Sequence, residues 1–299
     1  MLMQGKDDNK EKWQNSWREA CYTLSIEGTV TACNLYERIN MSHHRVELKD
    51  VSFAYPDGHQ ALQSVSFLLG HGESVGIVGA NGAGKSTLLS VLTGIQFPQK
   101  GTVRVGDLPV NKKTLAEVRR SVGLVFQEPD DQLFMTSVYD DVAFGPRNYK
   151  LDQEDVDKRV MEALEQVGIV HLKDRPPYKL SGGEKRLAAI AAVISMKPDI
   201  LIMDEPTASL DPQARRKIMS ILKGFSHTKI ITSHDLDMIM DMCSRTIVLK
   251  KGQIVADGNT VEILSNKKLM EEAGLEIPLA LQNCPVCGFD KRLQIKEGQ

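Results

Sequence analysis

The stretch G-A-N-G-A-G-K-S-T, from Gly79 to Thr87, constrains the fold more strongly than any other part of this sequence. It fits the pattern G-x-x-x-x-G-K-[S/T] in full, which is typical of a loop that binds phosphate. Glycines let backbone N–H groups turn toward a phosphate without Cβ clashes, and Lys85 adds a positive charge for the β- and γ-phosphates. Ser86 supplies a hydroxyl for Mg²⁺. The predicted contacts of a nucleoside triphosphate are Gly79, Asn81, Gly82, Gly84, Lys85, Ser86 and Thr87.

The residues on both sides of this phosphate loop support the same interpretation. The apolar run S-V-G-I-V-G (74–79) predicts a short buried strand before the loop. The next helix begins near Lys85, so its positive end points at the bound anion. The expected apolar face of that helix consists of Leu88, Leu89, Leu92 and Ile95. A glycine-rich turn with a chance lysine does not explain these flanks.

An acidic pair adds the expected hydrolytic chemistry. I-L-I-M-D-E-P (200–206) predicts a buried strand with Asp204 at its carboxyl end, where ligands bind in open α/β sheets. Asp204 can hold Mg²⁺ through water, and Glu205 can orient and deprotonate the attacking water. Because an apolar run ending in Asp-Glu is common, this interpretation depends on its pairing with the phosphate loop. His234 follows another buried strand of the same predicted sheet, and we interpret it as a sensor of the γ-phosphate rather than an ordinary surface histidine.

A helix is predicted to begin at Ser181 in K-L-S-G-G-E-K-R-L-A-A-I. Ser181 and Glu184 have the spacing of a capping box, which is the simplest explanation of the motif. A cap does not require Gly182 and Gly183, however, and glycine is a poor helix former. Two glycines at a helix start permit the close approach of an anion, so Ser181, Gly182 and Gly183 are predicted to form a second phosphate site.

Composition limits the kinds of partner. The chain has 299 residues and is 41% hydrophobic and 25% charged. Its net charge is −2, so the protein as a whole has no positive electrostatic field that would attract nucleic acid. No apolar run approaches the roughly 18 residues of a membrane-spanning helix, so membrane association is expected to go through a partner protein. Five cysteines without framework spacing indicate a reducing cytosol. The N-terminus has no apolar segment typical of a secretory signal.

The sequence divides into three parts. Residues 44–264 are predicted to form one α/β domain, with a helical region of about 127–185 inserted in it. The strand signals are R-V-E-L-K-D-V-S-F-A-Y (45–55), S-F-L-L-G (66–70), I-L-I-M (200–203), K-I-I-T (229–232) and a hairpin turning at Lys251-Gly252. Residues 1–43 are interpreted as an N-terminal extension, either a disordered leader or a stretch upstream of a true start at Met41. Residues 265–299 form a C-terminal tail.

Taken together, the motifs resemble the ATP-binding cassette (ABC) superfamily over about residues 44–262. The resemblance implies an α/β fold with a P-loop NTPase (RecA-like) core, an antiparallel β subdomain and an inserted α-helical subdomain. It also implies an ATPase, with ATP and Mg²⁺ as ligands. In that family two subunits pack head to tail, and each ATP lies between the phosphate loop of one subunit and the L-S-G-G-E helix of the other.

The same resemblance assigns further residues. Tyr55 is implied to stack on adenine, Gln127 to reach Mg²⁺ and the attacking water, and Asp211 to communicate across the dimer. Glu184 stands where the family more often has glutamine. The expected catalytic residues are thus Glu205, His234, Gln127 and Lys85. No N-K-x-D stretch specifying guanine is found, which favours ATP over GTP.

The segment F-Q-E-P-D-D-Q-L-F (126–134) and the downstream D-D-V-A-F-G-P closely resemble energy-coupling factor (ECF) transporters. The sequence of residues 233–245 and 254–264 is similar to that of the cobalt and nickel uptake group. This implies a homodimer at the cytoplasmic face of the membrane, bound to a transmembrane coupling subunit and a substrate-binding membrane subunit. Asp130 and Asp131 are expected to pair with arginines of the coupling subunit, above an apolar floor of Leu133 and Phe134.

Several alternatives remain open at this point. An ECF ATPase for a vitamin, which commonly works with a second, different ATPase, fits the same motifs, and a soluble iron–sulfur assembly ATPase fits the cassette without the P-D-D-Q-L-F segment. The choice between homodimer and heterodimer is open too. Cys284 and Cys287, in C-P-V-C-G, have the spacing of half a zinc site, and the alternative is a flexible chain end.

Overall fold

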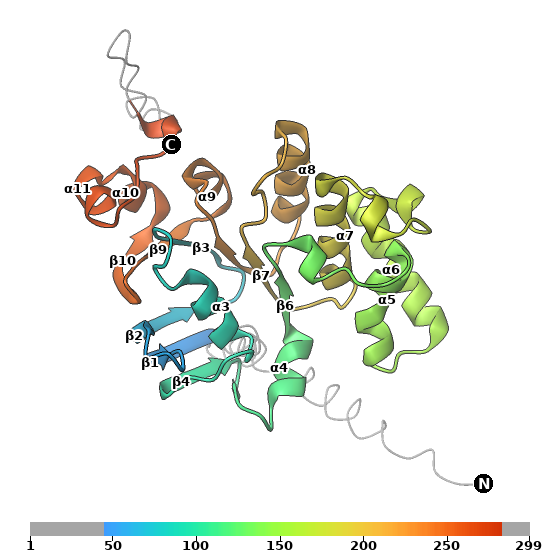
Figure 1. Ribbon diagram of the computed structural model, residues 1–299, viewed down its shortest axis with the longest axis horizontal. Coiled ribbons are helices and arrows are strands. Elements are labelled where there is room, and N and C mark those ends of the chain that lie inside the picture. Colours follow the sequence, from blue (N-terminus) through green and yellow to red (C-terminus); the bar gives the residue numbers. More distant parts are fainter. Residues whose placement is uncertain (1–44, 283–299) are drawn as a thin grey trace, which may run out of the picture. The chain divides into compact units, whose positions relative to one another are not determined.

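The computed structural model describes residues 45–282 of the chain (Figure 1). The N-terminal extension 1–43, the alternative start at Met41 and the pair Cys284 and Cys287 lie outside the described residues.

Within this range, the main sheet has six strands in the order β10-β9-β3-β8-β7-β6. Their bounds are β10 Gln253–Asn259, β9 Arg245–Lys250, β3 Ser74–Val78, β8 Thr228–Thr232, β7 Ile200–Asp204 and β6 Val122–Val125. β10 is antiparallel to β9, and the other neighbours are parallel. The carboxyl ends of β3, β7 and β8 therefore lie at the same end of the sheet, and the segments with the phosphate loop, Asp204 and His234 follow them.

Strand β7 shows why the predicted run is wholly apolar. Leu201 and Met203 face the core under the helical segment, whereas Ile200 and Ile202 face the core under the antiparallel sheet. Successive side chains of a strand point to opposite faces, so a strand covered on both faces needs apolar residues throughout. Each of these buried side chains stabilises the fold by about 1.5–3 kcal/mol. The strand that carries Asp204 at its end is thus firmly held.

The second sheet is antiparallel, with the order β2-β1-β4-β5. Its strands are β2 Gln60–Leu69, β1 Val46–Ala54, β4 Lys100–Val105 and β5 Leu108–Pro109. Val46 and Leu48 are both buried, as the alternation in β1 predicts. The sequence did not predict β4 or β5, and it placed the start of β2 at Ser66 rather than Gln60.

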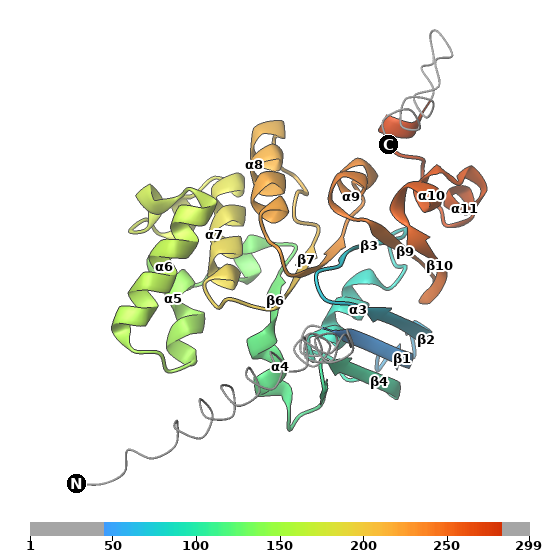
Figure 2. The same ribbon diagram turned by 180° about the vertical axis from the view of Figure 1, so that it is seen from behind.

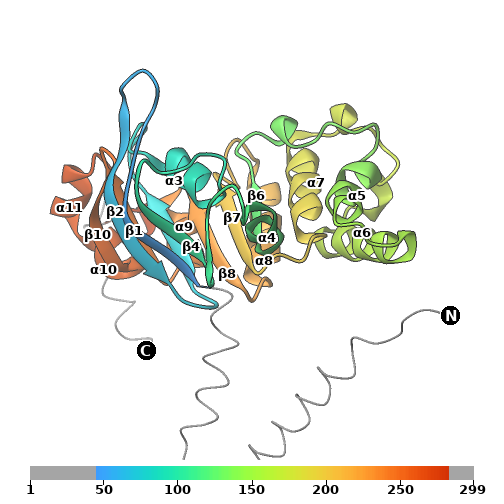
Figure 3. The ribbon, with the colours of Figure 1, turned by 90° about the horizontal axis from the view of Figure 1, so that it is seen from below.

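Helix α3 (Lys85–Leu92) lies between the two sheets (Figure 3). Leu88, Leu89 and Leu92 pack into a core shared with β1, β2 and β3. The assignment of Ile95 to this apolar face was wrong, because the helix ends at Leu92 and Ile95 is 47% exposed.

Helices α5 (Val138–Asn148), α6 (Gln153–Val167) and α7 (Gly182–Ile194) pack side by side next to β6 (Figures 1 and 2). The boundaries of α6 follow from its capping residues: Asp152 accepts a hydrogen bond from Asp155 N at the start, and Gly168, with φ 69°, ends the helix in the left-handed region. These helices share a core with one face of the main sheet. The α/β fold class with an antiparallel sheet and an inserted helical segment is confirmed.

The remaining helices surround the main sheet. They are α4 Leu115–Ser121, α8 Pro212–Lys223, α9 Leu236–Met242, α10 Thr260–Ser265 and α11 Lys267–Glu272, with 3-10 turns at Pro129–Asp131, Val170–Leu172, Pro177–Lys179 and Leu279–Leu281. The hairpin predicted at Lys251-Gly252 is confirmed, since both turn residues have positive φ between β9 and β10. None of the helices in residues 45–282 has both the length and the apolar character needed to cross a bilayer.

Candidate functional site

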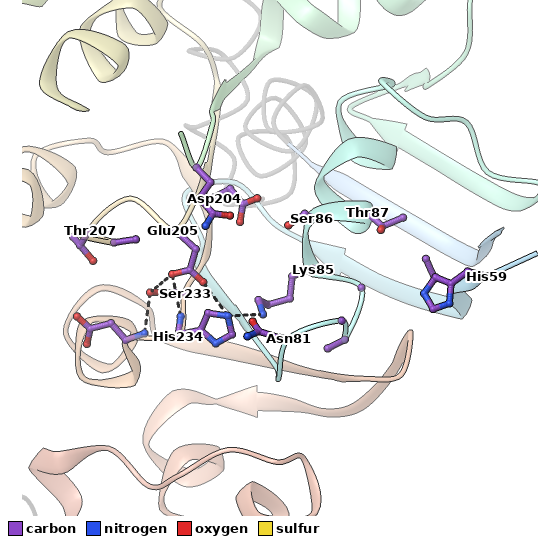
Figure 4. Close-up of a pocket in the computed structure, with 17 residues that line it drawn as sticks. His59, Asn81, Lys85, Ser86, Thr87, Asp204, Glu205, Thr207, Ser233 and His234 are labelled. Carbon is purple, nitrogen blue, oxygen red and sulfur yellow. Dashed lines mark hydrogen bonds and ion pairs between the residues drawn. The ribbon is translucent and has the colours of Figure 1, made fainter. Parts of the chain in front are cut away.

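A cavity of about 500 Å³ opens at the carboxyl ends of β3, β7 and β8 (Figure 4). The predicted residues that line it are Asn81, Gly82, Gly84, Lys85, Ser86, Thr87, Gln127, Asp204, Glu205 and His234. These residues come from three strand ends, from helix α3 and from the loop after β6. The fold therefore brings together side chains that are far apart in the sequence.

The phosphate loop can take its shape only with glycine at position 84. Gly84 has φ 105°, a conformation that side-chain-bearing residues rarely adopt. A Cβ atom there would lie 2.6 Å from the carbonyl oxygen of Ala61. The left-handed turn at Gly84 immediately precedes Lys85, the first residue of α3, so the loop wraps the amino end of that helix.

Lys85 is almost fully buried and bonds to the loop itself. Its Nζ donates to the carbonyl oxygen of Gly79 at 2.8 Å and lies 3.2 Å from Nε2 of His234. Burial lowers the pKa of Lys85 from its ordinary value, and the carboxylates of Glu205 and Asp204 partly oppose that shift. The positive charge is thus held at the base of the loop, where an incoming phosphate would gain its hydrogen bonds.

Glu205 is the most unusual carboxylate of the cavity. Its Oε2 accepts hydrogen bonds from Ser233 Oγ at 3.3 Å and from the backbone N–H of His234 at 3.2 Å. Its Oε1 is buried, has no hydrogen-bond donor among the described residues and lies 3.6 Å from His234 Nε2. Buried polar atoms are rarely left without a partner, so this oxygen is placed to accept a bond from something that enters the cavity. The backbone of Glu205 is also strained, with φ 48°.

The cavity contains oxygen donors suited to Mg²⁺. Ser86, Gln127 and Asp204 all line it, and they supply a hydroxyl, an amide oxygen and a carboxylate. Hard divalent cations prefer such ligands. Asp204 Oδ1 accepts a hydrogen bond from Thr232 Oγ1, which fixes the carboxylate while its other oxygen can face the cavity. The residues present therefore fit the ion that the sequence predicts.

Tyr55, the predicted adenine contact, is bonded to a residue of the cavity. Tyr55 does not line the cavity; its hydroxyl pairs with Thr87 Oγ1 at 3.0 Å. His59 lines the cavity instead, and its ring stacks on that of Tyr55 with centroids 6.4 Å apart. The sequence did not single out His59, Ala61, Ala83, Thr207, Ala208, Ser233 or Asp235 as cavity residues. Nearness to Glu205, to His234 or to the phosphate loop was a usable signal for all of these except His59 and Ala61.

The second predicted phosphate site lies elsewhere in the fold. Ser181, Gly182, Gly183 and Asp211 do not line the cavity. Ser181 caps α7, and the complete capping box with Glu184 is confirmed: Ser181 N donates to Glu184 Oε2 at 2.8 Å. Asp211 caps α8 by accepting from Gln213 N and Ala214 N. Ser181 and Asp211 thus have local structural roles as helix caps, and none of the four residues lines the cavity of its own chain.

The acidic segment after Gln127 differs from the expectation. Asp130 forms an ion pair of 2.7 Å with Lys185 of the same chain, and its side chain remains 70% exposed. Leu133 is buried in the core and provides no exposed floor. Phe134 is 63% exposed, and its ring contacts that of Phe144 with centroids 5.0 Å apart. Of the predicted apolar pair, only Phe134 is available at the surface.

Comparison with known proteins identifies close relatives. Residues 62–208 match the family model described as "ABC transporter". A protein from Geobacter sulfurreducens, whose name places it among ABC transporter ATP-binding proteins, is 61% identical over 83% of this chain and 100% of its own length. The "energy-coupling factor transporter ATP-binding protein EcfA" of Carboxydothermus hydrogenoformans is 44% identical over 79% of this chain and 88% of its own.

Solved structures give the same result. The structure of cbiO1 from Clostridium perfringens, described as part of the ABC transporter complex cbiONQ, has a TM-score of 0.68 at 40% identity and covers 76% of this chain and 93% of that chain. The ATP-binding cassette MJ0796, solved as a dimer in a post-hydrolysis state bound to ADP and Pi, has a TM-score of 0.66 at 28% identity and covers 72% of this chain and 98% of that chain.

Proposed function

The chain belongs to the ABC transporter family, among its energy-coupling factor ATPases, and from this premise we propose that it drives the import of cobalt or nickel ions as a head-to-tail homodimer. It is an ATPase that couples the hydrolysis of ATP to transport. We further infer the cargo, the pairing of two chains, the roles of the site residues and the membrane partners.

The position of Ser181, Gly182 and Gly183, here called the signature residues, supports a homodimer. Ser181, Gly182 and Gly183 lie outside the cavity that holds Lys85 and Glu205, so one chain does not place them on its own nucleotide. A second copy supplies them if the two chains pack head to tail. Because every chain carries both halves intact, both sites of such a dimer would hydrolyse ATP. The MJ0796 dimer shows that a related cassette adopts a dimeric state.

The geometry suggests how the residues divide the work. Backbone amides of the phosphate loop bind the phosphates, and Lys85 transfers its hydrogen bond from the Gly79 carbonyl to them. Glu205 holds the attacking water on Oε1 and takes its proton, while Ser233 and the His234 N–H fix Oε2. When bound by Ser86, Gln127 and Asp204, Mg²⁺ would neutralise charge on the β- and γ-phosphates.

The observation that carries the transport role is an exposed aromatic pair. Phe134, on the segment that follows Gln127, is 63% exposed and contacts Phe144 of helix α5, which is 40% exposed. Exposed apolar clusters of this kind mark protein interfaces, and buried aromatics often dominate the binding energy there. We assign this pair, in place of Asp130 and Leu133, as the contact for the transmembrane coupling subunit at the cytoplasmic face of the membrane.

The choice of a metal cargo rests on similarity. The energy-coupling factor relatives and the similarity to cbiO1 support an ECF transporter. The sequence of residues 233–245 and 254–264 favours the cobalt and nickel group over a vitamin transporter. Selectivity would reside in the membrane subunit. Reconstitution in proteoliposomes distinguishes the cargoes, because ATP-dependent uptake of cobalt or nickel is expected and uptake of a vitamin alone would contradict the proposal.

Co-purification from membranes tests the docking assignment. We expect Phe134→Ser to abolish recovery of the coupling subunit while ATP turnover of the isolated protein stays unchanged, because the ring lies outside the nucleotide cavity. Leu279→Ser is the matched control, since Leu279 is 70% exposed in a different region, and it should co-purify normally. Full recovery of the coupling subunit with Phe134→Ser would refute the assignment.

A further inference from the structure

The loop that carries Gln127 is bonded directly to helix α7. Arg186, in the second turn of that helix, donates from Nη1 to the carbonyl oxygen of Phe126 at 2.6 Å. Its Nη2 donates to the carbonyl oxygen of Gln127 itself. One guanidinium thus holds two consecutive carbonyls, one on each side of the Cα atom of Gln127.

Two further contacts connect the same loop to the same helix. Gln132 donates from Nε2 to the carbonyl oxygen of Ala189 at 2.7 Å and accepts from the backbone N–H of Phe126 at 3.2 Å. Lys185 pairs with both carboxylate oxygens of Asp130, at 2.7 and 3.0 Å. The loop from Phe126 to Gln132 is therefore expected to move with α7 as one unit.

Arg186 is the central member of this set. It is 3% exposed, and its Nε has no hydrogen-bond partner among the described residues. Burial lowers its pKa, with Glu128, Asp204 and Glu205 opposing that effect through their negative charge. Burying a cation on neutral carbonyls is costly, so a role in stability alone would be served better by an apolar residue. The planar guanidinium is well suited to hold two acceptors in fixed positions.

We propose that Arg186 is a positioning residue that sets the place of Gln127 in the nucleotide site, and that α7 thereby connects the two nucleotide sites of the dimer. The second part rests on the proposed head-to-tail homodimer. The amino end of α7, at Ser181, would contact the ATP held by the partner, while Arg186 in the next turn holds the glutamine of its own chain's site. Arrival of one ATP would therefore alter the placement of Gln127 at the other.

Kinetics of the full-length chain with ATP and Mg²⁺ test the positioning role. Arg186→Gln removes the two charged donors, and we expect kcat to fall by about 10- to 100-fold, the usual effect of losing a partner that orients a ligating side chain. The Mg²⁺ concentration for half-maximal activity should rise, whereas the Kd for ATP measured without Mg²⁺ should stay unchanged. Arg186→Lys should recover part of the activity because one ammonium can still hold one carbonyl.

Lys229→Met is a matched control for the loss of a buried cation. Lys229 is 7% exposed and donates to the carbonyls of Leu222 and Phe225, away from the cavity. Lys229→Met should change the melting temperature without changing the Mg²⁺ requirement.

A double variant provides a second test. If Arg186 acts through Gln127, the variant that combines Gln127→Ala with Arg186→Gln should hydrolyse ATP no more slowly than Gln127→Ala alone.

Three results would overturn the positioning role. They are an unchanged Mg²⁺ requirement in Arg186→Gln, additive losses in the double variant, and a loss in Arg186→Gln that Gln127→Ala does not share. These measurements need neither cargo nor membrane subunit, so failure of the transport proposal would leave them interpretable. The connection between sites is tested by ATP cooperativity, which should disappear in Arg186→Gln and would argue against the connection if it persisted.

Discussion

Replacing Glu205 by glutamine separates the proposed chemistry from binding. The change removes the negative charge and the ability to take a proton, but it keeps an oxygen that can accept from Ser233 Oγ and His234 N. The shape of the side chain is nearly unchanged. Glu205→Gln is therefore expected to bind ATP normally and to accumulate in the ATP-bound state.

The size of the effect follows from the role of a general base. Such a base contributes about 10²–10⁴-fold, which corresponds to roughly 2.7–5.5 kcal/mol in the activation barrier. Stability should not suffer. Oε1 of Glu205 is buried and has no hydrogen-bond donor within residues 45–282, and leaving such a group unsatisfied costs about 1–3 kcal/mol, more when it is charged. Removing that charge is expected to leave the melting temperature equal or higher.

Single-turnover hydrolysis, equilibrium ATP binding and thermal unfolding should be measured together. Glu262→Gln, an exposed carboxylate on α10, is the matched control and should behave as the unmodified protein in all three assays. Turnover of Glu205→Gln within a factor of about 3 of the unmodified protein would show that Glu205 is not the base, since it lies far below the range of general-base effects.

Three further predictions follow from charge and burial. Lys85→Ala should weaken ATP binding by about 10- to 100-fold in calorimetry, because a hydrogen bond to a charged group contributes about 1.5–3 kcal/mol. Burial raises the pKa of Asp141 above its ordinary value of 3.8 although Phe134 N and Met135 N donate to it. The folded state therefore binds this proton more tightly than the unfolded state. Stability falls as the pH rises from the pKa of the unfolded state to the higher pKa of the folded state. Asp141→Asn should raise the melting temperature at pH 7 by an amount that shrinks toward acidic pH, and a pH-independent difference would contradict this. Burial raises the pKa of Cys243 to about 12, so peptide mapping should find Cys243 unmodified by thiol reagents in the folded protein, and rapid labelling would contradict its burial.

The sequence predicted elements whose signals are local. The buried strand that ends at Asp204, the capping box at Ser181 and the turn at Lys251-Gly252 each depend on residues within a few positions of one another. Strands β4, β5 and β6 were missed. For β4 the reason is that Lys100–Val105 is short, half exposed and stabilised by pairing with β1, which is distant in sequence. Pairing with a remote strand leaves little trace in local composition.

The sequence predicted which residues belong to the site, but it did not predict which other residues of the chain they contact. The acidic segment after Gln127 was expected to face another protein, yet Asp130 contacts Lys185, 55 positions away, and Gln132 contacts the same helix. Likewise, nothing local to Arg186 in the sequence indicated its contact with Gln127. Such long-range side-chain contacts are fixed by the packing of α7 against the loop, which one sequence does not reveal.

In the proposed dimer each ATP site is made by two chains, and mixing two inactive variants distinguishes this arrangement from a site that one chain completes alone. Lys85→Ala damages the phosphate loop. Gly182→Asp damages only the signature, because a Cβ at Gly182 meets nothing within 4 Å in its own chain, while the added carboxylate would repel a phosphate brought by the partner. We predict that each variant alone is inactive and that an equimolar mixture regains about a quarter of normal ATP turnover, since random pairing gives about half mixed dimers with one intact site each. A mixture no more active than the two separate variants, or normal turnover by Gly182→Asp alone, would contradict the account.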